Sequence, residues 1–155
     1  MKIKTLTISM LCCISTFAFA DKTIKPVING KTYNSFELNL KTLPKPIKVI
    51  KGEPDECNGG NFPDQYDFGS YTVNTNDRIE TVRMTKNNAV IFYGKKVDAS
   101  MTKANFQKIF KGKINLDEEN PNRFSASSEE DEYKSIVFYF KNNHLDHYKL
   151  WVNDC

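Results

Sequence analysis

The chain has 155 residues, of which 39% are hydrophobic and 26% charged, and its formal net charge is +3. This length suits one domain with a hydrophobic core. The 22 basic and 19 acidic residues lack the strong basic excess of nucleic-acid-binding proteins, so we expect no nucleic-acid partner.

Residues 1–20 have the three parts of a bacterial Sec-type signal peptide. A short basic start is followed by an uncharged apolar stretch over residues 5–17 and by the cleavage motif Ala18-Phe19-Ala20. The apolar stretch is shorter than the ~20 residues that span a membrane. We therefore predict a single mature domain over residues 21–155, periplasmic or secreted, with no membrane insertion after cleavage.

Pairs of similar segments, 64 to 66 residues apart, occur throughout the predicted mature domain. Val27-Ile28-Asn29-Gly30-Lys31 resembles Ile91-Phe92-Tyr93-Gly94-Lys95, and residues 79–84 resemble residues 145–150. Each Gly-Lys pair indicates a hairpin turn. We predict tandem repeats over residues 24–86 and 88–152, each a hairpin, a short helix and a longer hairpin.

Two short helices are expected, at residues 36–43 and 102–111. Pro44 must end the first one. For the second, Thr102 is the predicted N-cap and Gly112 the residue that ends it. Its buried face would carry Phe106, Ile109 and Phe110. The predicted fold class is α+β, with a mostly antiparallel β-sheet.

Two cysteines, Cys57 and Cys155, remain in the mature chain, because Cys12 and Cys13 lie in the signal peptide. In an exported protein two cysteines most simply form one disulfide. This bridge would close a loop of nearly a hundred residues, which chain entropy values at about 4–5 kcal/mol. The alternative is that one or both cysteines are free reactive thiols, but no activating partner lies nearby in the sequence.

Residues 133–140 and 145–152 form the clearest hairpin, rich in aromatic and β-branched residues. A two-residue Asn142-Asn143 turn would place Phe138 opposite His147. We favour a three-residue turn with Asn143 in the left-handed region and Ile136 opposite Tyr148. That register gathers one apolar face, made of Phe138, Phe140, Tyr148, Leu150 and Val152.

The opposite face of this hairpin would carry Val137, Tyr139, Leu145 and Trp151. We expect Trp151 to be buried under a loop near the disulfide, because large aromatic side chains are mostly buried. The alternative is an exposed aromatic platform.

No motif for a nucleophile, a phosphate loop or a cofactor is present, so we predict neither catalysis nor a cofactor. The two histidines, His144 and His147, are three residues apart and would point to opposite faces of a strand. They therefore do not predict a metal site.

Charge is arranged in blocks along the chain. Residues 95–113 hold six lysines and one acid, whereas residues 117–132 hold seven acids and one arginine. This pattern indicates either an ordinary solvated surface or a dipolar surface that steers a charged protein partner.

Three segments resemble, in architecture, the β-lactamase-inhibitor-like group of exported proteins. They are Leu43-Pro44-Lys45-Pro46 after the first expected helix, the strand opening at residues 68–73, and residues 79–84 pairing back. Repeats in that group combine a short helical segment with an antiparallel sheet. The resemblance implies a rigid sheet that grips a protein.

Together these features predict a non-catalytic exported protein that binds another protein, as an inhibitor or immunity-type protein. The alternative is a periplasmic module for a small ligand or glycan, and a small carboxylate-dependent hydrolase is a third option. In the ligand-binding alternative, aromatic residues would line a pocket. The candidates are Tyr66, Phe68, Tyr93 and Trp151.

Overall fold

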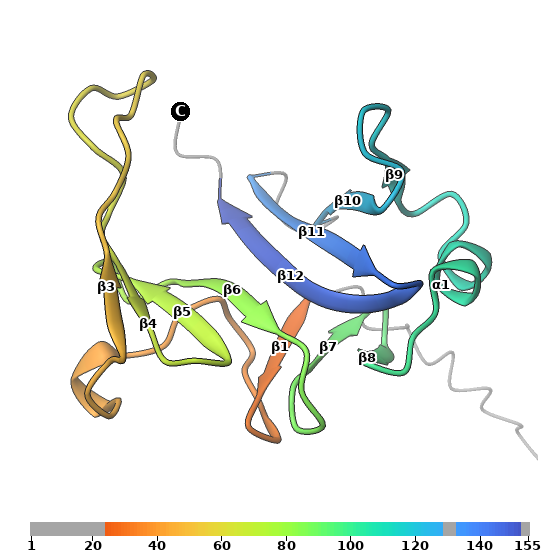
Figure 1. Cartoon of the computed structure of the whole chain (residues 1–155), viewed down its shortest axis with the longest axis horizontal. Coiled ribbons are helices and arrows are strands. Elements are labelled where there is room, and N and C mark those ends of the chain that lie inside the picture. The colour runs from red at the N-terminus through yellow and green to blue at the C-terminus, as the bar shows by residue number, and fades with distance from the viewer. Residues whose placement is uncertain (1–23, 129–132, 153–155) are drawn as a thin grey trace, which may run out of the picture.

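Two antiparallel sheets and one α-helix form the fold (Figure 1), in a computed structural model that describes residues 24–128 and 133–152. The predicted signal peptide, Cys155 and part of the acidic block lie outside these residues. The predicted dominance of antiparallel β-structure is confirmed. No described helix is long and apolar enough to cross a membrane.

The smaller sheet has the order β2-β1-β7-β8 and consists of two hairpins joined along β1 and β7. Its strands are β1 (Lys25–Ile28), β2 (Lys31–Thr32), β7 (Ala89–Phe92) and β8 (Lys95–Asp98). Both expected hairpins are present. Their turns are Asn29-Gly30 and Tyr93-Gly94, and all four residues have positive φ. This geometry is that of the two-residue turns that match the twist of a hairpin.

The larger sheet has eight strands in the order β3-β4-β5-β6-β12-β11-β10-β9. The first four strands are β3 (Lys48–Ile50), β4 (Gln65–Asp67), β5 (Tyr71–Asn74) and β6 (Ile79–Arg83). The others are β9 (Asn115–Leu116), β10 (Arg123–Ser127), β11 (Lys134–Lys141) and β12 (His144–Val152). Strands β6 and β12 pair at the centre, so each half of the chain contributes four neighbouring strands.

The core lies between the two sheets, and side chains alternate across each strand of the larger one. One register row runs Tyr71–Val82–Tyr148–Phe138–Phe124 across five strands, and all five side chains are buried. We call this side the inner face. The hydroxyl of Tyr148 donates a 2.9 Å hydrogen bond to the Ala89 carbonyl and so ties the two sheets together. Burial raises the pKa of this phenol.

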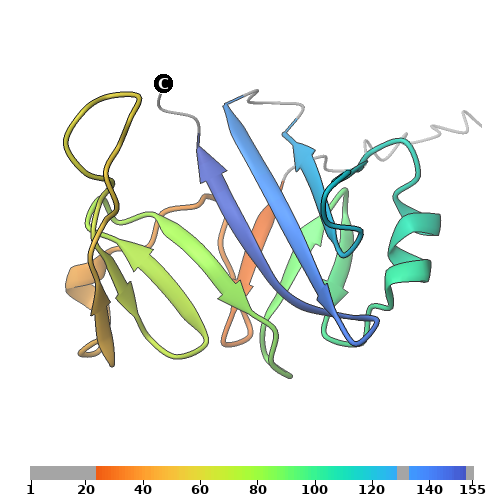
Figure 2. The same ribbon diagram turned by 45° about the horizontal axis from the view of Figure 1, so that its top comes forward.

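Helix α1 (Lys103–Ile109) closes one end of this core, as Figure 2 shows. Its N-cap is Thr102, as predicted, because the Thr102 side chain accepts a hydrogen bond from the Asn105 amide. Phe106 and Phe110 are fully buried against Phe92. Ile109 was expected on the same buried face, and this prediction is wrong, since Ile109 is 43% exposed.

The other predicted helix, at residues 36–43, is wrong in type and length. Only a 3-10 helix, η1 (Leu40–Thr42), forms there. The chain before it is extended: Glu37 bridges to Arg78, and the Phe36 carbonyl accepts from the Ile79 amide. These tertiary hydrogen bonds hold the backbone that an α-helix would need for its own first turn.

The register of the final hairpin differs from both expectations. The turn has two residues, Asn142 and Asn143, with φ of 51° and 66°. A β-bulge at Asp146 then shifts the pairing, so that Ile136 lies opposite Leu150 and Phe138 opposite Tyr148. The apolar face was predicted correctly for Phe138, Phe140, Tyr148 and Leu150. Leu145, expected on the other face, is also buried.

Candidate binding face and cleft

The side of the larger sheet that points away from the smaller sheet is here called the outer face. One register row crosses all eight strands on this side. It consists of Lys48, Asp67, Thr72, Thr81, Lys149, Val137, Ser125 and Asn115. In Figures 1 and 2 the smaller sheet and α1 lie on the opposite side. Seven of the eight side chains are polar and only Thr72 among them is buried, so the outer face is a largely polar surface.

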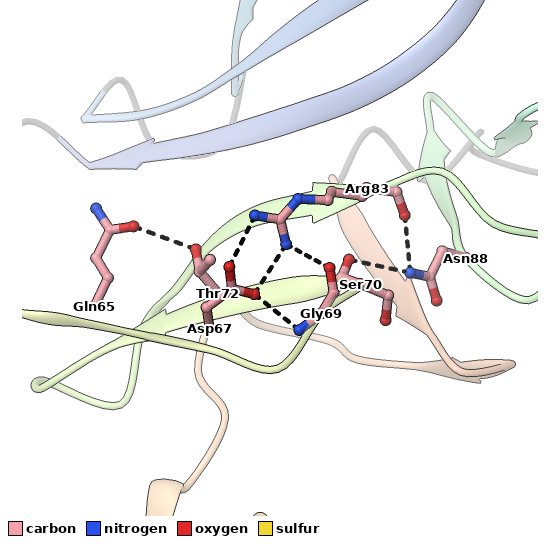
Figure 3. Close-up of polar contacts among 7 residues, drawn as sticks. All are labelled: Gln65, Asp67, Gly69, Ser70, Thr72, Arg83 and Asn88. Atoms are coloured by element: carbon pink, nitrogen blue, oxygen red, sulfur yellow. Dashed lines mark hydrogen bonds and ion pairs between the residues drawn. The ribbon is translucent and has the colours of Figure 1, made fainter. Parts of the chain in front are cut away.

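An ion-pair network fixes the outer face over β4, β5 and β6 (Figure 3). The Arg83 guanidinium donates to both carboxylate oxygens of Asp67, at 3.0 and 3.1 Å, and also to the Gly69 carbonyl. Burial alone would raise the pKa of Asp67, but the hydrogen bonds from Arg83 and the Gly69 amide outweigh it and hold this pKa below its usual value. Asn88 extends the network by donating to the Ser70 and Arg83 carbonyls.

Over β11 and β12 the outer face is aromatic and basic. The rings of Tyr139 and His147 stack with centroids 4.3 Å apart, and the Lys149 ammonium lies 5.6 Å from the Tyr139 centroid. His147 also contacts the Asp146 carboxylate at 2.7 Å. No described carboxylate forms an ion pair with Lys149, in contrast to Arg83 on β6.

At the edge of this face a cleft of about 570 Å³ opens between the β3–β4 connection and the end of β12. This size is within the roughly 300–1,000 Å³ of small-molecule sites. The connection, residues 51–64, rises beside the C-terminal end of β12 in Figure 1. The cleft is lined by Ile50, Lys51, Gly52, Glu53, Asp55, Asn58, Phe62, Pro63, Gln65, Asn74, Arg78, Glu80, Lys149, Trp151 and Val152.

Internal hydrogen bonds make the 51–64 connection a defined wall. The Phe62 amide donates to Glu53, and the Asp55 amide donates to Gly60, so the segment continues the β3–β4 hairpin. Gly52 is required where the two strands of this wall cross, since a Cβ there would lie 1.6 Å from the Phe62 carbonyl oxygen.

Side-chain caps and a disulfide complete this wall. The Asp64 carboxylate accepts from Lys51 and from the Gly52 amide. The Asp55 carboxylate caps the amides of Cys57 and Asn58, and mainly the Asn58 amide lowers its pKa. Cys57 is disulfide-bonded. Its predicted partner, Cys155, lies outside the described residues, so the pairing stays a prediction.

Two aromatic rings stand at the mouth of the cleft. Phe62 from the wall and Trp151 from β12 make an edge-to-face contact with centroids 6.5 Å apart. They remain 44% and 52% exposed. The expected contact of Trp151 with a loop near the predicted disulfide is present, since Phe62 belongs to that loop, but the expected burial of Trp151 is wrong.

Hydrogen bonds from buried side chains hold the polar residues that line the cleft. Asn74 is buried; its side-chain oxygen accepts from the Asn76 and Arg78 amides, and its side-chain nitrogen donates to Glu80. Gln65 accepts from the Thr72 hydroxyl at 3.4 Å. Three cationic and three anionic side chains line the cleft.

Of the four aromatic residues expected to line a pocket, only Trp151 lines this cleft. Tyr66 lies on the inner side of β4 beside Val73, and Phe68 stacks on Tyr71 at 5.0 Å. Tyr93 lies in the β7–β8 turn, with the Lys113 ammonium 3.9 Å from its ring centroid.

Phe62, Gln65 and Lys149 line the cleft but were not predicted from the sequence. The one sequence feature that could have indicated this site is Phe62, an aromatic residue in a stretch otherwise made of turn-forming residues.

The two histidines lie on β12 without converging on other ligands. His144 contacts the Asn142 carbonyl, and His147 contacts Asp146. Within residues 24–128 and 133–152, no three His, Cys, Asp or Glu side chains are grouped so as to hold a metal ion.

Comparison with protein-family models, with curated proteins and with solved structures found no match.

Proposed function

We propose that the protein is a non-catalytic exported protein that binds another protein through the outer face of its eight-stranded sheet. One observation carries the proposal: a row of seven polar side chains and Val137 crosses all eight strands on the side that faces away from the smaller sheet and α1. A sheet packed on one side and solvated on the other is a stable platform. The resemblance to β-lactamase-inhibitor-like proteins implies a rigid sheet that grips a protein, and an inhibitor or immunity-type role would use such a platform.

The chemistry of the face supports a specific interface. Arg83 is fixed by Asp67 and Gly69 before any partner arrives, so little side-chain entropy is lost on binding. Half-exposed Trp151 and the stacked Tyr139–His147 pair offer aromatic area, which is enriched in interface hot spots. Lys149 lies between them in the register and supplies charge for recognition.

Export by the predicted signal peptide belongs to the same proposal, as does a Cys57–Cys155 disulfide. Both place the protein in the periplasm or outside the cell. The bridge would join the β3–β4 wall to the end of the chain beyond β12.

We also infer that residues 24–86 and 88–152 are tandem copies. The element order of two strands, a helical segment and four strands occurs twice, and both sheet orders are symmetric about their centres. The single-residue bulges fall at Glu80 and Asp146, which are 66 residues apart. The isolated bridges Glu37–Arg78 and Thr102–His144 are related by nearly the same offset.

The test is affinity capture with the oxidised mature protein, residues 21–155, from envelope extract and culture supernatant. The bait is compared with Lys149→Glu on the outer face and with Lys111→Glu, a matched charge reversal at an exposed position after α1. We expect one stoichiometric partner whose affinity falls about tenfold or more for Lys149→Glu and is unchanged for Lys111→Glu. Equal capture by all three baits would contradict the proposal.

A further inference from the structure

The cleft is formed by a long connection and a long strand, each of which has a shorter counterpart in the other half of the chain. The β3–β4 connection extends over residues 51–64, whereas the equivalent β9–β10 connection is confined to residues 117–122. Strand β12 has nine residues, whereas β6 has five. The longer connection and the longer strand meet where Phe62 contacts Trp151. Local additions that converge on one site are what a dedicated ligand site requires.

We propose that this cleft binds a neutral carbohydrate, as a short oligosaccharide. The cleft shares Lys149 and Trp151 with the protein interface proposed above, but it would take a different class of ligand, so the inference goes beyond that proposal. Three features of the cleft support this ligand: its aromatic mouth, its polar lining and its balance of charge.

The aromatic mouth suits the apolar faces of sugar rings. Phe62 and Trp151 are about half exposed and their planes are inclined by 63°, so they present two surfaces rather than one stack. A sugar ring has a face of C–H groups that packs on an aromatic ring and removes apolar area from water. The two inclined rings can therefore contact successive units of a chain.

The polar lining suits hydroxyl groups, each of which both donates and accepts. Lys149 provides a donor, Glu53 and Glu80 provide acceptors, and the Gln65 amide provides both. Buried Asn74 holds Glu80 in position through its side-chain nitrogen. Lys149, Glu80 and Gln65 come from three strands and Glu53 comes from the wall, so these groups approach a ligand from several directions.

The charge balance favours neutral ligands over anionic ones. Lys51, Arg78 and Lys149 are offset by Glu53, Asp55 and Glu80, and Lys51 is further neutralised by Asp64 at 2.6 Å. A sulfated or phosphorylated ligand would gain no net attraction and would place its charge beside carboxylates. A neutral polyhydroxylated ligand meets no such penalty.

Trp151 is the single tryptophan of the chain, so its fluorescence reports the cleft directly. The oxidised mature protein is titrated with neutral oligosaccharides of two to six units, including gluco-, chito- and malto-series. Sulfated and uronic-acid oligosaccharides of the same lengths form the second arm. We expect a saturable change of Trp151 emission with at least one neutral series and an affinity that stays within about twofold between 0.05 and 0.5 M salt.

Two variants locate the site, with melting temperatures as a check on folding. Phe62→Ala keeps the fluorescent probe and should weaken binding about tenfold, since the stacking surface is halved. Leu116→Ala, an exposed apolar truncation on the far edge strand β9, should leave affinity unchanged.

No saturable response to any neutral series would overturn the proposal. Binding restricted to anionic sugars and abolished by salt would overturn it too, as would equal affinity of the wild type and a folded Phe62→Ala. These titrations contain no protein partner, so their failure leaves the outer-face proposal intact, and failed capture of a partner leaves this one intact.

Discussion

Residues 24–86 and residues 88–152 form nearly the same succession of elements, but they contribute different side chains to the core. In the second segment the core is aromatic, with Phe106 of α1 in contact with Phe92, Phe124, Phe138 and Phe140. The first segment places the smaller side chains Val73, Ile79 and Val82 at the inner face. It has only the 3-10 helix η1, where Leu40 is partly buried.

The two segments also contribute different residues to the binding surface. The first segment supplies the fixed Arg83–Asp67 pair and the long wall of the cleft. The second supplies Lys149 and Trp151, which are more exposed. The difference shows that one segment carries most of the packing, whereas the additions that shape a binding site lie where the two segments meet.

The largest expected effect concerns the disulfide of the wall. Replacing both cysteines, Cys57→Ser with Cys155→Ser, should lower the free energy of unfolding by about 4–5 kcal/mol, because the loop that the bridge closes is long. Urea denaturation of the oxidised protein measures this loss. Reductant should destabilise the wild type equally and leave the variant unchanged. Two titratable thiols in the native, unreduced protein would disprove the predicted pairing.

Core truncation comes next and tests the unequal packing. Phe106→Ala should cost about 3–5 kcal/mol, since the side chain is fully buried among five other rings. Leu40→Ala, 66 residues earlier, should cost about 1–2 kcal/mol because Leu40 is only partly buried. Equal losses in urea denaturation would show that the first segment is packed as tightly as the second.

A smaller effect separates the two basic residues at equivalent places on β6 and β12. Arg83→Met should cost about 1 kcal/mol at pH 7, a value reduced by the 43% exposure of the Arg83 side chain, whereas Lys149→Met should stay within about 0.5 kcal/mol. The pKa of Asp67 is lowered in the fold, so the pair stabilises above the ordinary carboxyl pKa of about 4. This contribution is lost as the pH falls through the lower folded value.

Urea denaturation of both variants between pH 2 and 7 measures this difference. The gap between them should close in acid. A gap that is constant with pH would mean that Arg83 acts through packing and not through Asp67.

The smallest effect concerns the turn of the final hairpin. Asn143 has a φ of 66°, and the other two-residue turns have Gly30 or Gly94 at this place. Asn143→Gly should raise stability by about 0.5 kcal/mol, and Asn143→Ala should lower it, because alanine tolerates this conformation poorly. Thermal unfolding compares the three proteins. Greater stability of the alanine variant would contradict the two-residue turn.

Local signals predicted a good part of this fold. The N-cap Thr102 and the spacing of Phe106 and Phe110 located α1, and the Gly-Lys pairs located both small hairpins. The register of β11 and β12 was not accessible, because the bulge at Asp146 forms against β6, where the Met84 amide donates to the Asp146 carbonyl. The absence of the α-helix expected at residues 36–43 has a similar cause, since the backbone of this segment is hydrogen-bonded to residues 77–79.

The candidate site was harder to predict than the core. Trp151 was recognised as one of two alternatives. Phe62 and Gln65 lie at the end of the wall and the start of β4, far in sequence from Lys149, and the three residues share no motif. Tyr66, Phe68 and Tyr93 are aromatic like Trp151, yet they lie away from the cleft.

The sequence by itself determined which side chains are apolar, which turns accept positive φ and where a helix can be capped, because these properties depend on neighbouring residues. Only the tertiary structure decided the bulged register, the eight-stranded order and the meeting of Phe62 with Trp151. Each of these depends on hydrogen bonds or contacts between residues far apart in the chain. Those interactions are selected by the packing of the whole domain.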